Sequence, residues 1–260
     1  MKQIFILTYC RSLDLLWSST LVFDSLRVGF PHSQIFVFDN VSLPEARSVI
    51  REKCLKLECQ YVQLQTEVLH HDFIEEKIRT HSGCVIFVDP DICFWKSCED
   101  WAFDALFAGR YVPQFYDDFA KAITVERLHT SLFWIPDAQK LTKCVEEVQL
   151  EYFDFHPLRP FAFKHDADWY RYDAGSTLYS AFRKYAYQFT DRELSCYDHL
   201  FCGSHLDFVL ERIDEASART LRQFYSAAKS STMQIKGVWK QQDAYFEERR
   251  PRRSVLLGRQ

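Results

Sequence analysis

Four apolar segments, separated by stretches with helical signals, fill the first ninety residues and constrain the fold most strongly. The segments read as strands: QIFILTY (3–9), QIFVFDN (34–40), QYVQLQ (60–65) and CVIFVDPD (84–91). The stretches between them read as helices: 14–28, 44–57 and 70–83. Parallel strands are buried on both faces, and helices usually connect them. The alternation therefore predicts an α/β protein with a Rossmann-type, mixed but mostly parallel sheet and helices on both faces.

The order of elements is less regular beyond residue 100. The segment RLHTSLFWIPDAQKL (127–141) predicts a strand followed by a helix that is entered through Pro136 and Asp137. Residues 154–173 are rich in proline, aromatic and charged side chains and read as a long loop, a kind of segment that is often functional. Further helices are expected at 175–189 and from about 212 onward.

Composition and charge narrow the class of protein. The 260 residues suit one large α/β domain or two subdomains that share a core. A net charge of −4 argues against nucleic-acid binding by the whole surface. No apolar run approaches the ~18 residues needed to span a bilayer, and the start of the chain lacks a small-residue cleavage site. We therefore expect a cytoplasmic protein without a transmembrane segment.

The nine cysteines are scattered along the chain and form no C-x-x-C pair. Several lie within apolar runs, where a free cysteine behaves as a small apolar residue. We interpret them as reduced core thiols rather than as disulfides or zinc ligands.

Polar side chains follow three of the four predicted strands. Thr8 and Tyr9 end the first strand, Asp39 ends the second, and Asp89 and Asp91 end the fourth. Ligands of parallel sheets bind outside the carboxyl ends of the strands, so these side chains are expected around one crevice. No G-x-G-x-x-G follows the first strand, which argues against a dinucleotide-binding site.

The acid pair Asp89 and Asp91 indicates a cation site. Residues i and i+2 of an extended segment point to the same side, and Pro90 favours extended geometry at Asp89. Two neighbouring carboxylates repel each other unless a positive group lies between them. Mg²⁺ or Mn²⁺ meets this need, since both take carboxylate and phosphate oxygens as ligands. The alternative interpretation is a solvated Asp-Pro-Asp turn at the end of a strand.

An apolar strand that ends in D-x-D after three β-α units resembles the GT-A-fold nucleotide-sugar glycosyltransferases. The resemblance covers residues 3–95 in layout and extends more weakly to about 205. It implies a nucleotide-diphosphate-sugar donor, with Asp89 and Asp91 binding the metal ion and, through it, the diphosphate. It further implies a division of the chain into a donor-binding half, an acceptor-binding half of the same domain, and a C-terminal helical segment with a basic tail: 1–115, 116–215 and 216–260.

The same resemblance implies roles for the ends of the first two strands. Thr8 and Tyr9 stand where such enzymes hold the nucleobase and ribose. Asp39 stands where an acid accepts hydrogen bonds from the base or the ribose, and its alternative is a turn-forming Asp-Asn pair. Arg11 is expected to pair with the diphosphate, or else to be a surface arginine.

The segment DHLFCGSH (198–205) is similar to the H-x-x-G-x-x-K pattern of retaining members of this superfamily. His199 and His205 have the same six-residue separation, but the glycine lies at 203 and a histidine replaces the lysine. The pattern implies His199 as the third metal ligand and His205 as the group that binds the diphosphate. The alternatives are hydrogen-bonded structural histidines, with Lys236 or Lys240 as the cation for phosphate.

Two further assignments concern catalysis and the acceptor. An inverting enzyme needs a base, and we favour Asp173 in YDAGSTL over Asp166 or Asp168, although Asp173 also suits a helix N-cap. Trp169 lies in the predicted loop and suits an acceptor platform. The neighbouring His70, His71 and Asp72 are interpreted mainly as the first turn of a helix: HHD (70–72).

Other functions remain open from the sequence. A nucleotidyltransferase would share the fold and the acid pair, although TYCRSLDLL lacks the glycine-rich loop that such enzymes carry. A non-catalytic nucleotide-binding protein is another reading. The acceptor is expected to be a glycan or other hydroxyl. A modified DNA base that is contacted through RRPRR (249–253) is less favoured than a solvated tail.

Overall fold

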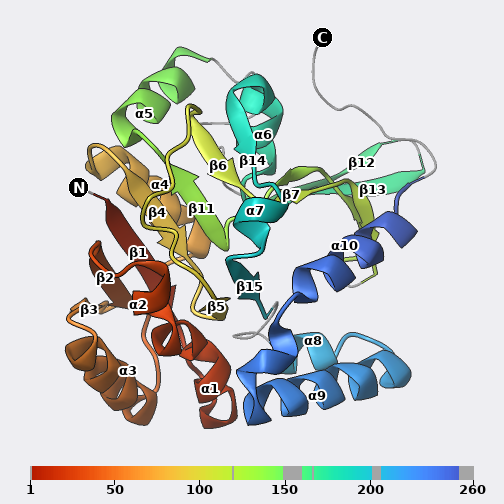
Figure 1. The fold of residues 1–260 in the computed structure, drawn as a ribbon. Helices are drawn as coiled ribbons and strands as arrows, with labels where there is room; N and C mark the ends of the chain where they lie inside the picture. The colour runs from red at the N-terminus through yellow and green to blue at the C-terminus, as the bar shows by residue number, and fades with distance from the viewer. Residues whose placement is uncertain (1, 119, 149–159, 166, 201–205, 252–260) are drawn as a thin grey trace.

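A seven-stranded sheet lies at the centre of the computed structural model, which describes residues 2–118, 120–148, 160–165, 167–200 and 206–251 (Figure 1). The strands lie in the order β14-β6-β11-β4-β1-β2-β3. Their bounds are β1 Gln3–Thr8, β2 Gln34–Asp39, β3 Gln60–Gln63, β4 Val85–Val88, β6 Phe107–Gly109, β11 Leu132–Ile135 and β14 Ala186–Gln188.

The sheet is mixed but mainly parallel. Strand β1 pairs in parallel with β2 and β4, β2 with β3, and β14 with β6. Strand β11 is antiparallel to both of its neighbours, β4 and β6. The predicted α/β class with a mostly parallel sheet is therefore confirmed. Strands β11 and β14 come from the second predicted half, so the two halves share one sheet; the proposed boundaries themselves stay a prediction.

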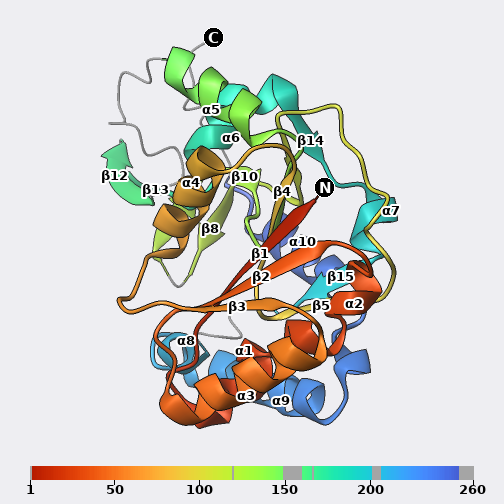
Figure 2. The same ribbon diagram turned by 90° about the vertical axis from the view of Figure 1, so that its left-hand side faces the viewer.

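Helices cover both faces of the sheet, as Figure 2 shows. Their bounds are α1 Leu16–Ser19, α2 Leu26–Gly29, α3 Pro44–Lys56, α4 His70–Thr80, α5 Ala138–Glu147 and α6 Ser176–Phe182. Side chains alternate along each strand, so Ile4 and Ile6 pack with Leu26 and Ile50 on one face. Phe5, between them, packs with α4, α5 and α6 on the other face. The predicted helix after Pro136 begins with Asp137 as its N-cap, which accepts a hydrogen bond from the Lys140 amide at 3.0 Å.

Three predicted elements differ from the structure, and the first is the helix expected at 14–28. It is broken into short turns: 3₁₀ turns at Leu13–Leu15 and Leu21–Asp24 alternate with α1 and α2. The Ser18 and Thr20 hydroxyls donate to carbonyls three and four residues back, which competes with regular helical bonding. The Val22 amide donates to the Pro90 carbonyl at 2.9 Å instead of continuing a helix.

The loop predicted at 154–173 is wrong for its described part. Residues Phe161–His165 (β12) and Asp168–Tyr172 (β13) form an antiparallel hairpin, and Phe161 stacks on Tyr172 at 4.6 Å between ring centroids. Residues 154–159 of that segment lie outside the described residues. The helix predicted at 175–189 ends at Phe182, because the chain then enters β14 at the edge of the sheet.

The remaining elements flank the central sheet. Smaller sheets are formed by β5 Ile92–Phe94 with β15 Tyr197–His199, by β7 Tyr111–Val112 with β10 Arg127–Leu128, and by β8 Phe115–Asp117 and β9 Ala122–Thr124 with β12 and β13. The helices predicted from about residue 212 are confirmed as α9 Glu215–Ser230 and α10 Val238–Glu248. The short α7 Asp191–Leu194 and α8 Leu206–Leu210 precede that stretch.

Two predictions from composition can be compared with the structure. Eight of the nine cysteines are described, and all eight are free, as expected; Cys202 lies outside the described residues. Within the part of the chain that the structure describes, no helix combines the length and apolar character needed to cross a bilayer.

Candidate metal and donor site

The two acids of the Asp-Pro-Asp segment come together in a tight turn at the carboxyl end of β4. The Ile92 amide donates to the Asp89 carbonyl across this turn, and the Asp89 amide donates to the Ser131 carbonyl at 2.7 Å. The segment is thus a turn and not the extended stretch expected from the sequence. The Asp91 side chain is 5% exposed and the Asp89 side chain 22%, so neither is a freely solvated turn residue.

His199 joins the acid pair from a distant part of the sequence. Strand β15 pairs antiparallel with β5, which places His199 opposite Ile92 and next to Asp91. The His199 Nε2 atom lies 3.1 Å from Asp91 Oδ1 and 3.8 Å from Asp89 Oδ2. One ligand atom from each of these three residues lies within 4.8 Å of the others. The structure therefore brings together the three residues that were predicted as metal ligands.

His70 adds a second imidazole to the same place. It is the first residue of α4, and its Nε2 atom lies 3.3 Å from Asp89 Oδ1. From the sequence, His70 was interpreted mainly as part of the first turn of a helix. Helices that follow parallel strands begin at the edge where ligands bind, so the position of His70 at a predicted helix start was the signal for this contact.

Two imidazoles lie against the acid pair and interact with its negative charge. Burial lowers the pKa of His70 and of His199, but Asp89 and Asp91 raise it by more, so both pKa values lie above the ordinary one. Burial raises the pKa of Asp89, but His70 and His199 lower it by more, so the net pKa lies below its ordinary value. The carboxylates thus lie in a partly buried place that favours positive charge.

The donor set fits a divalent cation. Two carboxylates suit Mg²⁺ and Mn²⁺ alike, and an imidazole nitrogen favours Mn²⁺ over Mg²⁺. Asp89, Asp91 and His199 would hold such an ion, and the ion would take over the charge compensation that His70 and His199 provide.

His129 lies against this cluster and was not identified from the sequence. Its ring centroid lies 5.1 Å from that of His199. The Ser131 amide donates to His129 Nδ1 at 3.1 Å, so the neutral ring carries its proton on Nε2. Burial and the nearby His199 and Arg127 hold the pKa of His129 well below its ordinary value. His129 is therefore a neutral imidazole with an N–H donor beside the metal ligands.

The antiparallel strand β11 explains why His129 lies there. Leu132, at the start of β11, pairs with Val88, at the end of β4. Residues that precede β11 therefore lie beside residues that follow β4. The sequence indicated a strand in this region but not its direction, and only an antiparallel β11 places His129 next to Asp89.

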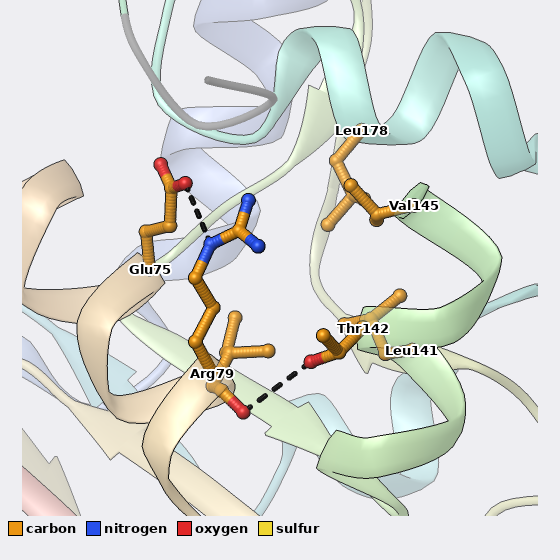
Figure 3. Close-up of a pocket in the computed structure, with 7 residues that line it drawn as sticks. Glu75, Arg79, Leu141, Thr142, Val145 and Leu178 are labelled. Atoms are coloured by element: carbon orange, nitrogen blue, oxygen red, sulfur yellow. Dashed lines mark hydrogen bonds and ion pairs between the residues drawn. The ribbon is translucent and has the colours of Figure 1, made fainter. Parts of the chain in front are cut away.

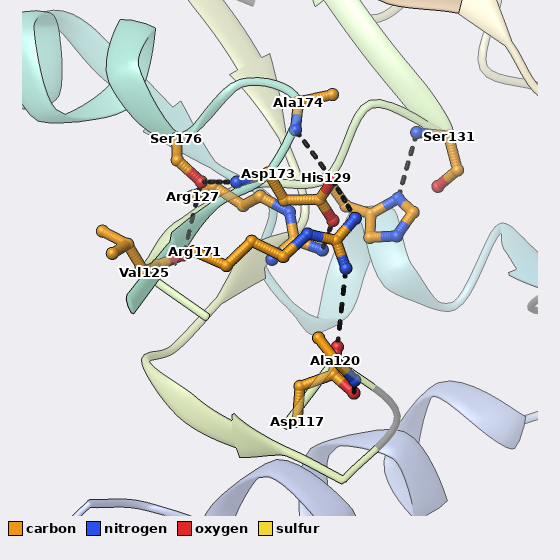
Figure 4. A network of polar contacts seen from close by, with 10 residues as sticks. All are labelled: Asp117, Ala120, Val125, Arg127, His129, Ser131, Arg171, Asp173, Ala174 and Ser176. Carbon is orange, nitrogen blue, oxygen red and sulfur yellow. Dashed lines mark hydrogen bonds and ion pairs between the residues drawn. The ribbon is translucent and has the colours of Figure 1, made fainter. Parts of the chain in front are cut away.

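Asp173 lies in an ionic network beside His129 (Figure 4). Its carboxylate lies 2.9 Å from Arg127 Nη2 and 3.4 Å from Arg171 Nη2, and Arg171 also approaches Asp117 at 3.9 Å. Burial raises the pKa of Asp173, but the two guanidinium groups lower it below its ordinary value. The N-cap of α6 is Gly175, at φ +87°, and not Asp173 as the alternative supposed. The role of Asp173 as a base stays a prediction.

The predicted residues of the first strand lie at the carboxyl edge of β1. Thr8 is fully buried, and its hydroxyl donates to the Ser19 carbonyl at 2.9 Å. The guanidinium of Arg11 lies over the Tyr9 ring at 4.6 Å and pairs with Glu67. The structure thus groups Tyr9, Arg11 and Glu67 on the surface, and their contact with a nucleotide stays a prediction.

Asp39 is more enclosed than a ligand-binding acid would be. It is fully buried, and its carboxylate accepts from the Ser42 amide at 3.0 Å, from Arg47 Nε at 3.1 Å and from the Tyr61 hydroxyl at 2.8 Å. In this arrangement Asp39 organises the turn after β2, in line with the turn-forming alternative. Contact with a base or ribose would require one of these protein donors to move.

The other predicted residues lie farther out. Trp169 is 53% exposed on β13. His205 and Asp166 lie outside the described residues, and Asp168 begins β13. The two lysines considered for phosphate lie over aromatic rings: Lys236 over Trp95 and Lys240 over Trp239.

A separate small pocket lies between α4, α5 and α6 (Figure 3). It is lined mainly by apolar groups, including Leu141, Val145 and Leu178. Arg79 pairs with Glu75 at its rim at 3.0 Å. None of the residues predicted for the functional site is among the described residues that line it, so it does not belong to the candidate site.

Comparison with known proteins identifies no family for this chain and finds only distant similarity to solved structures. No family model matches the chain, and no curated protein matches it in sequence. Among solved structures, this chain is similar to the glycosyltransferase GlyE of Streptococcus pneumoniae TIGR4, with 11% sequence identity and a TM-score of 0.43. The match covers 74% of this chain and 46% of GlyE. This chain is also similar to the mannosyltransferase PcManGT from Pyrobaculum calidifontis in complex with GDP-Man and Mn²⁺, with 13% sequence identity and a TM-score of 0.43. The match covers 73% of this chain and 54% of PcManGT.

A third similar structure is S. aureus TarS 1-349, at 14% identity and a TM-score of 0.43, over 94% of this chain and 78% of that one. The chain spans about half the length of the first two structures. At these identities and scores the likeness does not extend to a donor, an ion or an acceptor. The first two of these structures are a glycosyltransferase and a mannosyltransferase, and that description belongs to them and not to this chain.

Proposed function

We propose that the chain is a metal-dependent glycosyltransferase that moves a sugar from a nucleotide-diphosphate sugar to an acceptor hydroxyl. The observation that carries this proposal is the convergence of Asp89, Asp91 and His199 at the carboxyl edge of β4. This is the edge at which parallel sheets bind ligands. The protein's own charge compensation there, through two imidazoles, supports a site for a divalent cation.

Transfer of a glycosyl group breaks a C–O bond to a diphosphate, on which negative charge develops. A bound Mn²⁺ or Mg²⁺ supplies Lewis-acid stabilisation of that charge. The protein's part is to hold Asp89, Asp91 and His199 in place before the donor arrives. His129 offers a neutral N–H donor beside them, which suits a developing anion because it does not have to be protonated first.

The acceptor side is proposed along the outer face of β13. Trp169 and Arg171 alternate along β13 and therefore share one face of the strand, and Asp173 follows directly after its end, paired with Arg171. Tyr170 and Tyr172 are buried on the opposite face. This face runs from an exposed aromatic ring to the network beside His129, which suits an acceptor that stacks a sugar ring on Trp169.

An assay with a panel of nucleotide-diphosphate sugars and Mn²⁺ tests the proposal. A glycosyltransferase releases the nucleoside diphosphate, whereas a nucleotidyltransferase releases pyrophosphate. D91N should abolish the release. D118N makes the same change at a carboxylate that is 55% exposed, and should leave the release intact. Failure of all donors to bind in a metal-dependent way, or equal release by D91N, would overturn the proposal.

A further inference from the structure

The metal ligand His199 lies on a strand with little support of its own. Strand β15 has three residues, and within the described part of the chain it pairs with β5 alone in a two-stranded sheet. Two-stranded sheets of this size are marginally stable in water unless another element packs on them. Among the described elements, the short α7 and the longer α10 both pack on β15, and Figure 1 shows α10 beside it.

Helix α10 is bonded to the backbone of His199 itself. The Gln242 side-chain amide donates from Nε2 to the His199 carbonyl at 3.1 Å. The same amide accepts from Arg110 Nη1 through its Oε1 atom. Because Arg110 can only donate, it fixes which end of the Gln242 amide faces His199.

The neighbouring residue, Asp198, is bonded to the start of the same helix. Its side chain is buried, and its carboxylate accepts from the Gly237 amide at 2.7 Å and the Trp239 amide at 3.3 Å. It also accepts from Trp95 Nε1 at 2.7 Å. A carboxylate at the start of a helix satisfies free amides and interacts favourably with the helix dipole. Asp198 therefore fastens β15 to α10 one residue before the metal ligand.

Arg110 holds α10 from the side of the central sheet. It is 7% exposed and lies between β6 and β7. Its Nη2 atom donates to the Trp239 carbonyl at 3.0 Å and to Asp243 Oδ1 at 2.5 Å. A nearly buried guanidinium with three acceptors on one helix fixes the position of that helix relative to the sheet.

We propose that α10 positions His199 for metal binding. Gln242 is the positioning residue, because it bonds to the His199 carbonyl. Arg110 and Asp198 hold α10 and β15 in place relative to each other. This inference rests on the proposed metal site and assigns that site a support in the C-terminal part of the chain. Groups that orient a metal ligand change metal affinity by about 10- to 100-fold when they are removed.

Mn²⁺ affinity of the full chain, measured by electron paramagnetic resonance titration, tests the inference without any donor. Q242E keeps an acceptor for Arg110 but loses the N–H donor to His199, and Q242M loses both without adding charge. Both variants should raise the Kd for Mn²⁺ about 10-fold or more. The negative charge of Q242E by itself would lower that Kd, so weaker binding reports lost positioning. Q241E, one residue earlier on the exposed side of α10, is the charge-matched control and should bind like the wild type.

Melting temperatures of the variants show whether each one is folded when its affinity is measured, and Q242M serves if Q242E is not. Wild-type affinity in both Gln242 variants overturns the inference and leaves the proposed function standing. Absence of Mn²⁺ binding by the wild type itself removes the proposed metal site, and this inference with it.

Discussion

Replacement of Asp173 should show whether this carboxylate contributes to the free energy of unfolding, to catalysis, or to both. Its partner Arg127 has a side chain that is only 8% exposed, so D173N leaves a nearly buried guanidinium without its counter-charge. We expect a loss of about 3 kcal/mol in the free energy of unfolding, measured in urea at pH 7. D118N, which breaks an exposed pair with Arg249, should cost less than about 1 kcal/mol.

The stability difference between the wild type and D173N should depend on pH in a defined way. The pKa of Asp173 is lowered in the folded state below its ordinary 3.8. Its contribution is therefore complete about one pH unit above that ordinary value, near pH 5, and is lost as the pH falls through the folded-state pKa. The difference between wild type and D173N should be equal at pH 7 and pH 5. A difference that already shrinks between these values would point to a histidine and not to Asp173.

The catalytic reading of Asp173 is tested on the same variant by turnover. A general base needs a pKa near the working pH, and the two guanidinium groups move this pKa in the opposite direction. If D173N keeps turnover per folded molecule, Asp173 has a structural role. A loss of turnover without a loss of donor binding would support the prediction from the sequence.

The buried Cys54 and Cys93 and the half-buried Cys59 should be inert in the native protein. Burial raises the pKa of Cys54 to about 12 and those of Cys59 and Cys93 to about 11. The thiolate is the reactive form, so iodoacetamide at pH 8 should leave these three thiols unmodified until urea unfolds the chain. Peptide mass spectrometry reads each site separately. Rapid native labelling of Cys54 would contradict its burial.

Among the described glycines, Gly29, where α2 meets β5, has the least room for an added side-chain atom. A Cβ atom at Gly29 would lie 2.6 Å from Cγ of the buried Phe94. G29A should therefore cost about 1–3 kcal/mol through overpacking, as measured by urea unfolding. The combination of G29A with F94L should cost less than the sum of the two single changes, because the smaller side chain relieves the clash. Additive costs would show that the clash is relieved elsewhere.

Elements with strong local signals could be predicted from the sequence, and those fixed by distant contacts could not. Strands β1, β2 and β4 are apolar runs, and α3 begins with Pro44 and Glu45, so their patterns agree with the final fold. The stretch 14–28 has an apolar pattern of helical type, but its backbone bonds to Pro90 and its hydroxyls interrupt it. Strand β15 is three residues long, which is too short for any periodic pattern.

The residues of the candidate site also divide into those with a local sequence signal and those placed by distant contacts. The acids could be found because they end an apolar strand, and His199 because it resembles a known pattern. His129 and Arg127 could not be found, since their position depends on the antiparallel direction of β11. The ionic network of Asp173 depends on contacts between β10, β13 and the turn before α6, which no local pattern in the sequence records.

The protein as a whole should be stabilised by Mn²⁺, because a ligand that binds only the folded state adds its binding free energy to stability. At 100 times its Kd, an ion adds about 2.7 kcal/mol, which corresponds to a rise of about 5 °C or more in Tm for a domain of this size. Excess EDTA should abolish the rise. D91N should show no rise, whereas D118N should respond like the wild type. An equal rise in D91N would place the ion elsewhere.

The ligand set of this site has a consequence for the order of events during synthesis. Asp89 and Asp91 leave the ribosome long before His199, and Gln242 of α10, which is bonded to His199, follows later still. A nascent chain of this length therefore contains the two acids and His70 but not yet His199. On the proposed roles of His199 and α10, high-affinity ion capture would wait until the last helices have emerged, so the uptake of Mn²⁺ would report the completion of folding.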